Sequence, residues 1–292
     1  MAMISRHAYL IICHTNFEQL NILLDLLDDE RNDIFLHIDK KAKDFSIETI
    51  KSHAVHARLF FVKPIHVNWA GDSLVKVEIK LLTEATKTRH DYYHLISGMD
   101  LPLKSQNELH NFFSQNAGFD YVALEREHLC NITKSFMDRV NYYYLFQNHI
   151  KRGSNGIAAR LQRVHLRMQK TLKINRNKQS SLSFQKGSQW FSITHDTACY
   201  LLDEFKKVKK SFRYTFAPDE LFLQTILMQS PQIDKIIDDN LRYIDWERGN
   251  PYTFKQEDYT LLMNSNKLFA RKFDTSVDQA IILKIRDGIQ GR

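Results

Sequence analysis

The chain has 292 residues, of which 43% are hydrophobic and 26% charged, and its formal net charge is +7. This ordinary globular composition excludes a disordered, collagen-like or repeat-only protein, and a chain of this length buries enough surface to fold without disulfides or a metal. No apolar run reaches the roughly 18 residues of a membrane-spanning helix. The positive charge favours an anionic partner, which by composition is a nucleic acid, a phosphate-bearing substrate or a membrane surface.

The cysteines and the N-terminal residues bear on the cellular compartment. Cys13, Cys130 and Cys199 cannot all be paired, and the first residues lack the apolar stretch and cleavage site of a signal peptide. We therefore expect a reducing, cytoplasmic setting. Cys13 lies in an apolar run and is expected to be a small buried hydrophobic residue.

The first part of the chain alternates short apolar runs with amphipathic segments. Buried strands are predicted at 8–14, 34–39, 59–62, 92–97 and 119–124. Helices are predicted after an Asn16 cap, over 73–88, and over 106–115 behind a Ser105/Glu108 capping box. This alternation is typical of an α/β sheet with parallel strands, which binds ligands beyond the carboxyl ends of its strands. The polar residues that follow the strands are the first site candidates: His14, Asp39, Asp100 and Glu125.

The middle of the chain carries the positive charge. There is no Asp or Glu between Arg139 and His195, and the segment 151–178 holds nine Lys and Arg residues, so the rest of the chain has a net charge of −2. Apolar residues recur at steps of three or four and predict a basic amphipathic helix within a helical insertion over about 146–180. They are Ile157, Leu161, Val164, Met168 and Leu172. The helix either lies on anionic lipid, binds nucleic acid or is a solvated face of the protein.

Regular patterning returns after this segment. Residues 187–193 predict a strand, 197–209 a helix, 241–246 a late strand and 276–288 a final helix. At 217–220 we predict the opening of a further helix, with Pro218 at its first position and two acids in its first turn. We find no linker or repeat, so we expect one compact domain over 1–292.

Glu220 and the neighbouring cations Arg271 and Lys272 are the main candidates for chemistry. Glu220 is either an acid stabilised by a helix dipole or a general base. Arg271 and Lys272 stand between Phe269 and Phe273 and are either a solvated pair or a clamp on a diphosphate. The sequence has no Asp-x-Asp pair, which many sugar-nucleotide enzymes use to hold a divalent metal. Without a metal, a fixed Arg-Lys pair would have to neutralise a departing nucleoside diphosphate.

Two other polar segments have competing interpretations. In 37–41 (HIDKK), a metal site is disfavoured because no further ligand is near in sequence, and a strand-end pair that holds a nucleoside is favoured. Trp69 is either a core residue or a platform for a ligand, and the glycines beside it and in 97–102 allow close approach of the backbone.

Seven segments, taken in order, resemble the core-2/I-branching β-1,6-N-acetylglucosaminyltransferase family (glycosyltransferase family 14), which also includes peptide O-xylosyltransferases. They are 37–41, 67–75 (VNWAGDSLV), 94–105 (HLISGMDLPLKS), 186–194 (KGSQWFSIT), 217–227 (APDELFLQTIL), 242–246 (RYIDW) and 268–274 (LFARKFD). They spread over most of the chain, and the compact length and few cysteines are similar to a bacterial member. Two positions depart from the family, because Ala70 replaces a glycine of a W-G-G element and Gln189 stands where xylosyltransferases carry an acid.

The resemblance implies a GT-A-type fold, which is a Rossmann-like mixed sheet flanked by helices. Its donor half would cover about 1–115 and its acceptor and catalytic half about 116–292. The resemblance also implies a UDP-sugar donor, inversion at the anomeric carbon, and no cofactor or metal. UDP-N-acetylglucosamine is the default donor, with UDP-galactose, UDP-xylose and UDP-glucuronate open.

The resemblance also assigns roles to residues. Glu220 matches the catalytic base, and Arg271 and Lys272 match the positions that hold the UDP diphosphate. His14, Asp39, Trp69 and Asp100 complete the donor side. Glu125, Arg139 and Trp246 are the acceptor-side candidates.

These expectations describe an inverting, metal-independent glycosyltransferase that moves a sugar to a hydroxyl of a glycan acceptor in bacterial surface or exopolysaccharide synthesis. A lipid-linked acceptor would place the enzyme on the inner face of the cell membrane, with 151–178 against anionic lipid and no nucleic-acid partner. The alternative is a basic protein that binds nucleic acid or a membrane surface without catalysis.

Overall fold

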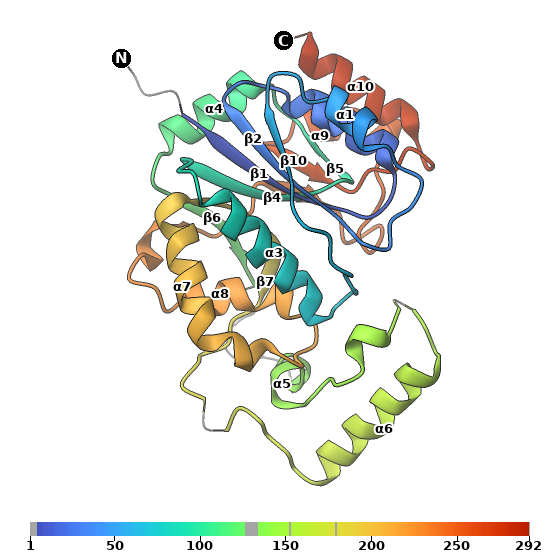
Figure 1. Ribbon diagram of the computed structural model, residues 1–292, viewed down its shortest axis with the longest axis vertical. Coiled ribbons are helices and arrows are strands. Elements are labelled where there is room, and N and C mark those ends of the chain that lie inside the picture. The colour runs from blue at the N-terminus through green and yellow to red at the C-terminus, as the bar shows by residue number, and fades with distance from the viewer. Residues whose placement is uncertain (1–4, 126–133, 152, 179, 292) are drawn as a thin grey trace.

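The computed structural model describes residues 5–125, 134–151, 153–178 and 180–291. Its core is a sheet of seven strands in the order β3-β2-β1-β4-β7-β6-β8, with helices on both faces (Figure 1). The strands are β1 (His7–Cys13), β2 (Asn32–Ile38), β3 (Arg58–Phe61), β4 (Tyr92–Ser97), β6 (Asp120–Leu124), β7 (Gly187–Thr194) and β8 (Ile236–Ile237).

The strand order confirms the predicted α/β architecture, a Rossmann-like mixed sheet flanked by helices. β1 pairs in parallel with β2 and β4, and β2 pairs in parallel with β3, which gives the 3-2-1-4 order of a Rossmann half-sheet. The parallel pairing expected from the strand–helix alternation is found from β1 to β4. The sheet as a whole is mixed, as the resemblance implied, because β7 runs antiparallel to β4 and β6. β7 follows the long basic segment rather than the single crossover helix that joins neighbouring parallel strands.

Two hydrophobic cores lie on opposite faces of the sheet, and β1 contributes to both. Tyr9 and Ile11 pack in the core formed with the helices 17–27 and 279–290, whereas Ala8 and Leu10 pack in the core formed with the helices 72–85, 195–212 and 222–227. Successive side chains of a strand point to opposite faces, so a strand covered on both sides appears in the sequence as one continuous apolar run.

The helices that cover the sheet largely follow the prediction. On the first face lie α1 (Phe17–Leu27), α4 (Gln106–Gln115), α9 (Tyr259–Met263) and α10 (Gln279–Gln290), and α2 (Ile47–Ser52) packs against α1. On the second lie α3 (Asp72–Ala85), α7 (His195–Phe212) and α8 (Phe222–Leu227). The 3-10 helices are Gln147–His149, Pro218–Glu220, Ile233–Lys235 and Gln256–Asp258.

Local signals set several helix boundaries and burial states. The Asn16 side chain accepts the N–H of Gln19, and Ser105 and Glu108 form the predicted capping box. Cys13 is buried as expected, and Cys199 is a free, half-buried cysteine, whereas Cys130 lies outside the described residues. Each described helix is too short or too polar to cross a lipid bilayer.

A second, three-stranded sheet was not predicted. Its strands are β5 (Asp100–Pro102), β10 (Phe269–Arg271) and β9 (Arg242–Ile244), in the order β5-β10-β9. β10 pairs antiparallel with β5 and parallel with β9, so that Arg271 lies opposite both Asp100 and Ile244. This sheet places β10 beside the carboxyl end of β4.

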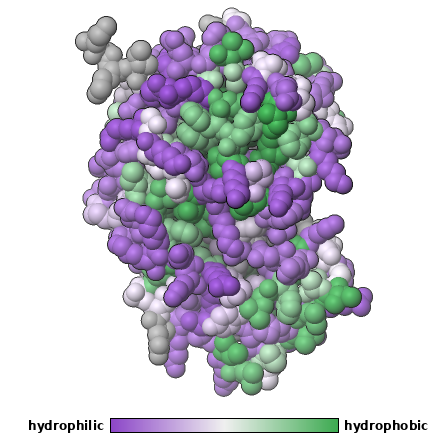
Figure 2. All heavy atoms as spheres, in the orientation of Figure 1, coloured by the Kyte–Doolittle hydropathy of each residue, from purple (hydrophilic) through white to green (hydrophobic). Residues whose placement is uncertain are grey.

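α5 (Lys134–Asn141) precedes the basic segment 151–178, which forms α6 (Ile157–Thr171), and α6 lies at one end of the molecule (Figure 1). The predicted amphipathic helix is confirmed, but its apolar stripe does not pack on the protein. The five apolar residues from Ile157 to Leu172 are 47% to 78% exposed, and Figure 2 shows the apolar atoms gathered at that end. The helix is held by its polar side, because Gln162 accepts the N–H of Phe146 and Gln169 accepts the N–H of Tyr143.

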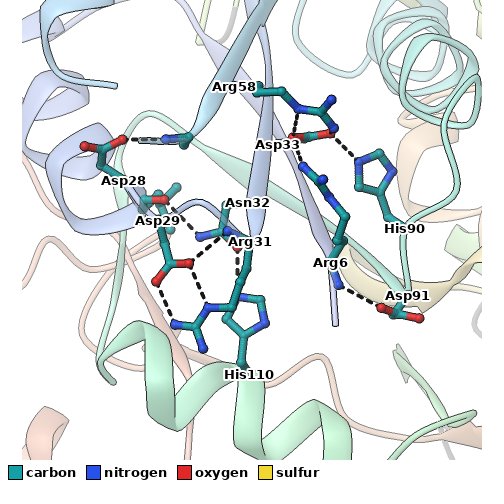
Figure 3. A network of polar contacts seen from close by, with 12 residues as sticks. Arg6, Asp28, Asp29, Arg31, Asn32, Asp33, Arg58, His90, Asp91 and His110 are labelled. Atoms are coloured by element: carbon teal, nitrogen blue, oxygen red, sulfur yellow. Dashed lines mark hydrogen bonds and ion pairs between the residues drawn. The ribbon is translucent and has the colours of Figure 1, made fainter. Parts of the chain in front are cut away.

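A network of ion pairs lies at the amino ends of the parallel strands (Figure 3). Asp33, at the amino end of β2, is buried and binds Arg6, Arg58 and His90. Burial alone would raise the pKa of Asp33, but the hydrogen bonds from His90 and Arg58 outweigh it and hold the pKa far below its usual range. This network ties β1, β2, β3 and the approach to β4 together and leaves the carboxyl ends of the strands for a site.

Candidate active site

Asp39 fixes the loop that leads to Trp69. It directly follows β2, and its N–H donates to the carbonyl of Cys13 at the end of β1 (2.8 Å). The carboxylate of Asp39 accepts the N–H of Lys41 (2.9 Å) and of Val67 (3.3 Å). Because the side chain is almost fully buried, these contacts hold the loop 65–71 against the carboxyl edge of the sheet.

His14 lies where the predicted donor residues meet. The surrounding protein removes enough water from this solvent-facing ring to lower its pKa. Arg271 and Lys272 act in the same direction, and only the negative charge of Asp39 opposes them. His14 directly follows β1 and Asp39 directly follows β2, and the N–H of Asp39 donates to Cys13. Arg271, the last residue of β10, donates to Ser97 at the end of β4, which neighbours β1, and Lys272 comes next. The structure therefore brings these four residues to one edge of the sheet, where the lowered pKa of His14 favours its neutral form.

Arg271 is held rigidly by Asp100. Its guanidinium donates to the Asp100 carboxylate (2.7 Å) and to the Ser97 hydroxyl, and lies over the Trp190 ring at 4.5 Å from the centroid. Asp100 also accepts the N–H of Ser97 (2.9 Å). Asp100 is completely buried, so its side chain orients Arg271. The sequence had instead suggested that Asp100 contacts the donor directly.

Lys272 and Trp246 lie at the same edge. Within the described part of the chain, no acidic side chain forms an ion pair with Lys272, and its backbone carbonyl accepts the N–H of Phe254 (2.9 Å). Trp246 is exposed and stands two residues beyond Ile244, the register partner of Arg271. Lys272 is thus a cation without an acidic ion-pair partner among the described residues. Trp246 exposes its aromatic ring at the same edge.

Glu220 ends a short turn instead of opening a long helix. The helix predicted from 217 is a 3-10 turn, Pro218–Glu220, and α8 begins only at Phe222, because Leu221 has a non-helical backbone conformation. The Glu220 carboxylate accepts a hydrogen bond from the Arg139 guanidinium (2.8 Å). Arg139 stacks on Phe216 at 5.3 Å, so this acceptor-side candidate is the ion-pair partner of the predicted base.

The Trp69 loop connects the donor edge with the Glu220 turn. The carbonyl of Ala70 accepts the N–H of Ala217 (2.8 Å), and the half-exposed Trp69 ring meets Phe216 edge-on at 5.8 Å. Ala70 has a φ of 56°, in the left-handed region that favours glycine. This backbone conformation explains why a glycine suits the corresponding place in the W-G-G element.

Two buried carboxyl groups beneath Glu220 were missed from the sequence. Burial and the negative charge of Glu220 raise the pKa of Asp219 to about 7. Burial, reinforced by the charge of Asp219, raises the pKa of Glu78 well above its ordinary value, and Gln189 donates to Glu78 at 2.8 Å. Burial thus favours the protonated form of Glu78. The available signal was its position on the apolar face of the predicted helix 73–88, where an acid is unexpected.

Glu125 is not joined to this group by any described contact. It follows β6, is exposed, and pairs with Lys186, and its acceptor role stays a prediction. In the described ranges, no three His, Cys, Asp or Glu side chains gather as metal ligands would. What the structure does assemble is a cationic edge at Arg271 and Lys272 and a carboxylate at Glu220, linked by the Trp69 loop.

The family model described as "Branch: Core-2/I-Branching enzyme" matches residues 7–264. Xylosyltransferase 2 of Rattus norvegicus is 24% identical over 307 residues, which cover 95% of this chain and 33% of that protein. Xylosyltransferase 1 of Rattus norvegicus is 22% identical over 314 residues, covering 98% and 36%. The chain thus spans about a third of the length of these relatives.

Among solved structures, mouse xyloside xylosyltransferase 1 in its apo form is similar at 8% identity and a TM-score of 0.40, with 91% of this chain and 97% of that chain covered. A likeness of this size carries no argument about function, and the fold rests on the strand order described above. The family model, in contrast, covers most of the chain and includes the Glu220 turn. The chain therefore belongs to the Core-2/I-branching enzyme family.

Proposed function

We propose that this protein is a glycosyltransferase that moves a sugar from a UDP-sugar to a hydroxyl of a glycan acceptor with inversion at the anomeric carbon. Membership of the Core-2/I-branching enzyme family supports the reaction class. The observation that carries the proposal is the gathering of His14, Asp39, Arg271 and Lys272 at the carboxyl edge of the sheet. That edge is where α/β sheets bind nucleotides.

Arg271 and Lys272 stabilise the negative charge that grows on the leaving diphosphate. Because buried Asp100 and the Trp190 ring fix Arg271, its donors are oriented before the substrate arrives. Asp100 offsets part of the charge of Arg271, so the uncommitted Lys272 supplies the net positive charge. We propose that these two cations act without a metal or other cofactor, and that neutral His14 and Asp39 line the nucleotide.

Glu220 acts as the general base. Arg139 holds its carboxylate in one orientation at 2.8 Å, and the Trp69 loop places the turn beside the donor edge. Glu220 takes the proton of the acceptor hydroxyl while that oxygen attacks the anomeric carbon and the bond to the diphosphate breaks. A positioned base of this kind contributes about 10²–10⁴-fold to the rate.

The sugar and the acceptor follow from the resemblance and from the exposed aromatic rings. We propose N-acetylglucosamine as the transferred sugar and a surface or exopolysaccharide glycan of a bacterium as the acceptor. Trp69 and Trp246 present exposed faces on which a sugar ring can stack, and Glu125 is proposed as an outer acceptor contact.

We also propose that the enzyme is cytoplasmic and peripheral on the inner face of the cell membrane. α6 turns its apolar stripe to the solvent and is held by two glutamines on its opposite side. The surrounding segment is basic and free of acids, a combination that suits anionic lipid. Sedimentation with anionic and neutral liposomes tests this. It compares Leu161→Glu/Val164→Glu with Val55→Glu, which alters an even more exposed apolar residue elsewhere. Unchanged sedimentation of the α6 variant would reject membrane binding.

The experiment that tests the catalytic proposal is a UDP-release assay over a panel of UDP-sugars. Glu220→Gln should keep the affinity for UDP, measured by calorimetry, and lose turnover by about 10²–10⁴-fold, because the amide cannot accept the proton. Glu30→Gln, an exposed change at the other end of the sheet, is the matched control. Unchanged turnover in Glu220→Gln would remove this residue from the mechanism.

A further inference from the structure

A cavity of about 460 Å³ lies beside the turn that carries Glu220, without including Glu220 itself. Its walls come from α3, the end of α7 and the residues after it, and Pro218, which begins the turn, is one of them. The volume is in the range of sites for small organic ligands. None of the donor residues lines it.

The floor of this cavity is apolar and preformed. Val75 and Phe212 are almost fully buried members of the core between α3 and α7, and Phe205 packs against that core. Because these side chains are held by the core, the cavity keeps its shape without a ligand. A floor of this kind takes an apolar chain rather than a sugar, whose hydroxyl groups would lose their hydrogen bonds to water.

The rim of the cavity is cationic. Lys209, Lys210 and Arg213 are exposed, and none of them pairs with an acid among the residues that the structure describes. The Arg213 guanidinium lies on the Tyr214 ring at 4.8 Å, which holds it at the rim. Three uncompensated cations at the mouth of an apolar cavity suit a phosphate group.

The acid in the wall does not cancel this charge. Asp72 pairs with Lys76 at 2.8 Å and also accepts a hydrogen bond from Asn148 at 2.8 Å. Its negative charge is therefore compensated locally, by a fourth cation of the wall.

The rim is also joined directly to the segment that carries α6. The carbonyl of Arg213 accepts a hydrogen bond from Arg176 (2.7 Å), and the carbonyl of Tyr214 accepts the N–H of Tyr144 (2.8 Å). These hydrogen bonds fix the rim of the cavity to the segment that carries α6.

We propose that this cavity binds the lipid-phosphate end of the acceptor, with the apolar chain on the Val75–Phe212 floor and the phosphate among Lys209, Lys210 and Arg213. The proposal rests on the proposed function and deepens it, because it names an amphiphilic phosphate ester as the acceptor class. The glycan beyond the phosphate would extend past Pro218 to Glu220.

Calorimetric titration with n-dodecyl phosphate below its micellar concentration tests this binding without donor or vesicles. Inorganic phosphate, butyl phosphate and neutral dodecyl maltoside should each bind about tenfold more weakly or worse, since each lacks part of the apolar or charged contact. Lys209→Glu/Lys210→Glu should weaken dodecyl phosphate by about tenfold or more. Lys206→Glu/Lys207→Glu makes the same charge change one turn earlier on α7 and should bind like the wild type. Thermal unfolding of both variants checks that the fold is kept.

Four outcomes would overturn the proposal. If both lysine double variants bound dodecyl phosphate equally weakly, binding would depend on the general surface charge. If inorganic phosphate bound as tightly as dodecyl phosphate, the site would be a simple anion site. Equal binding of dodecyl maltoside would mean an apolar site without charge recognition. Loss of binding in Leu161→Glu/Val164→Glu would place the amphiphile on α6 instead of the cavity. Because the titration contains no donor, its failure leaves the Glu220→Gln test of the transferase function unaffected.

Discussion

Replacing Arg271 by alanine should damage both the fold and the binding of UDP, and the two effects can be separated. The substitution removes one partner of an ion pair whose other member, Asp100, is completely buried. Asp100 then keeps the hydrogen bonds from Ser97 and the attraction of the buried Arg242. Lys272→Ala, in contrast, removes a cation that no described acid contacts, so it should weaken UDP without unfolding the protein.

The size of the stability loss follows from this burial. Removing one partner of a buried pair destabilises a protein by about 3–5 kcal/mol, and Ser97 together with the partial exposure of Arg271 favours the lower end. A chain of 292 residues gains about 0.6 kcal/mol/K of unfolding entropy near 60 °C. A loss of about 3 kcal/mol therefore lowers Tm by about 5 °C.

The assay is thermal unfolding of four variants beside calorimetric titration with UDP. The matched variant is Arg271→Ala/Asp100→Asn, in which the amide keeps an acceptor for the N–H of Ser97 but carries no buried charge. It should recover about half or more of the Tm lost in Arg271→Ala, since the uncompensated charge is the main cost. Asp100→Asn and Lys272→Ala complete the set, and only Lys272→Ala should weaken UDP with an unchanged Tm.

Two results would refute this reasoning. An unchanged Tm in Arg271→Ala would show that the ion pair with Asp100 does not stabilise the fold. A double variant no more stable than Arg271→Ala would show that the loss has another origin than the buried charge.

Burial lowers the pKa of His7, His94 and His110, and it lowers that of His110 to about 4. When the pH is below the unperturbed histidine pKa of 6.5, these residues therefore bind more protons in the unfolded chain than in the folded one. Stability should therefore fall as the pH drops from about 6.5 towards 4, by up to about 1.4 kcal/mol per histidine per pH unit, and a flat urea series at pH 7, 6 and 5 would contradict this. Gly187→Ala should destabilise by at least about 1–3 kcal/mol, because its Cβ would lie 2.0 Å from a backbone carbonyl oxygen of β6. Gly156→Ala, whose nearest contact is 3.4 Å, is the control, and equal denaturation midpoints for the two variants would be the contrary result. Full UDP release in excess EDTA is expected, and a strict Mn²⁺ requirement would reject the metal-free mechanism.

Features that depend on neighbouring residues could be predicted from the sequence. The predicted strand 8–14 agrees with β1, His7–Cys13, to within one residue at each end. The prediction succeeded because a strand that is buried on both faces appears in the sequence as one continuous apolar run. The Ser105/Glu108 capping box and the Asn16 cap formed as predicted, since each needs only residues three apart.

Features that depend on distant pairing could not be predicted. β5 pairs with β10, which follows about 170 residues later, and neither strand is long enough to have a pattern of its own. The contact of Arg139 with Glu220 joins residues 81 positions apart. The apolar stripe of α6 was visible in the sequence, but no local signal says whether such a stripe is covered or faces solvent.

The loop 65–71 is positioned by its main chain. Ile65 and Val67 donate their N–H groups to the strand-end residues His37 and Asp39, and Ala70 accepts the N–H of Ala217 through its carbonyl. None of these loop contacts uses a side chain of the loop. The Trp69 ring, however, meets Phe216 edge-on, and Phe216 carries the Arg139 guanidinium that binds Glu220. A substitution of Trp69 would therefore keep the course of the loop backbone, but it would change the packing beneath the ion pair of Arg139 and Glu220.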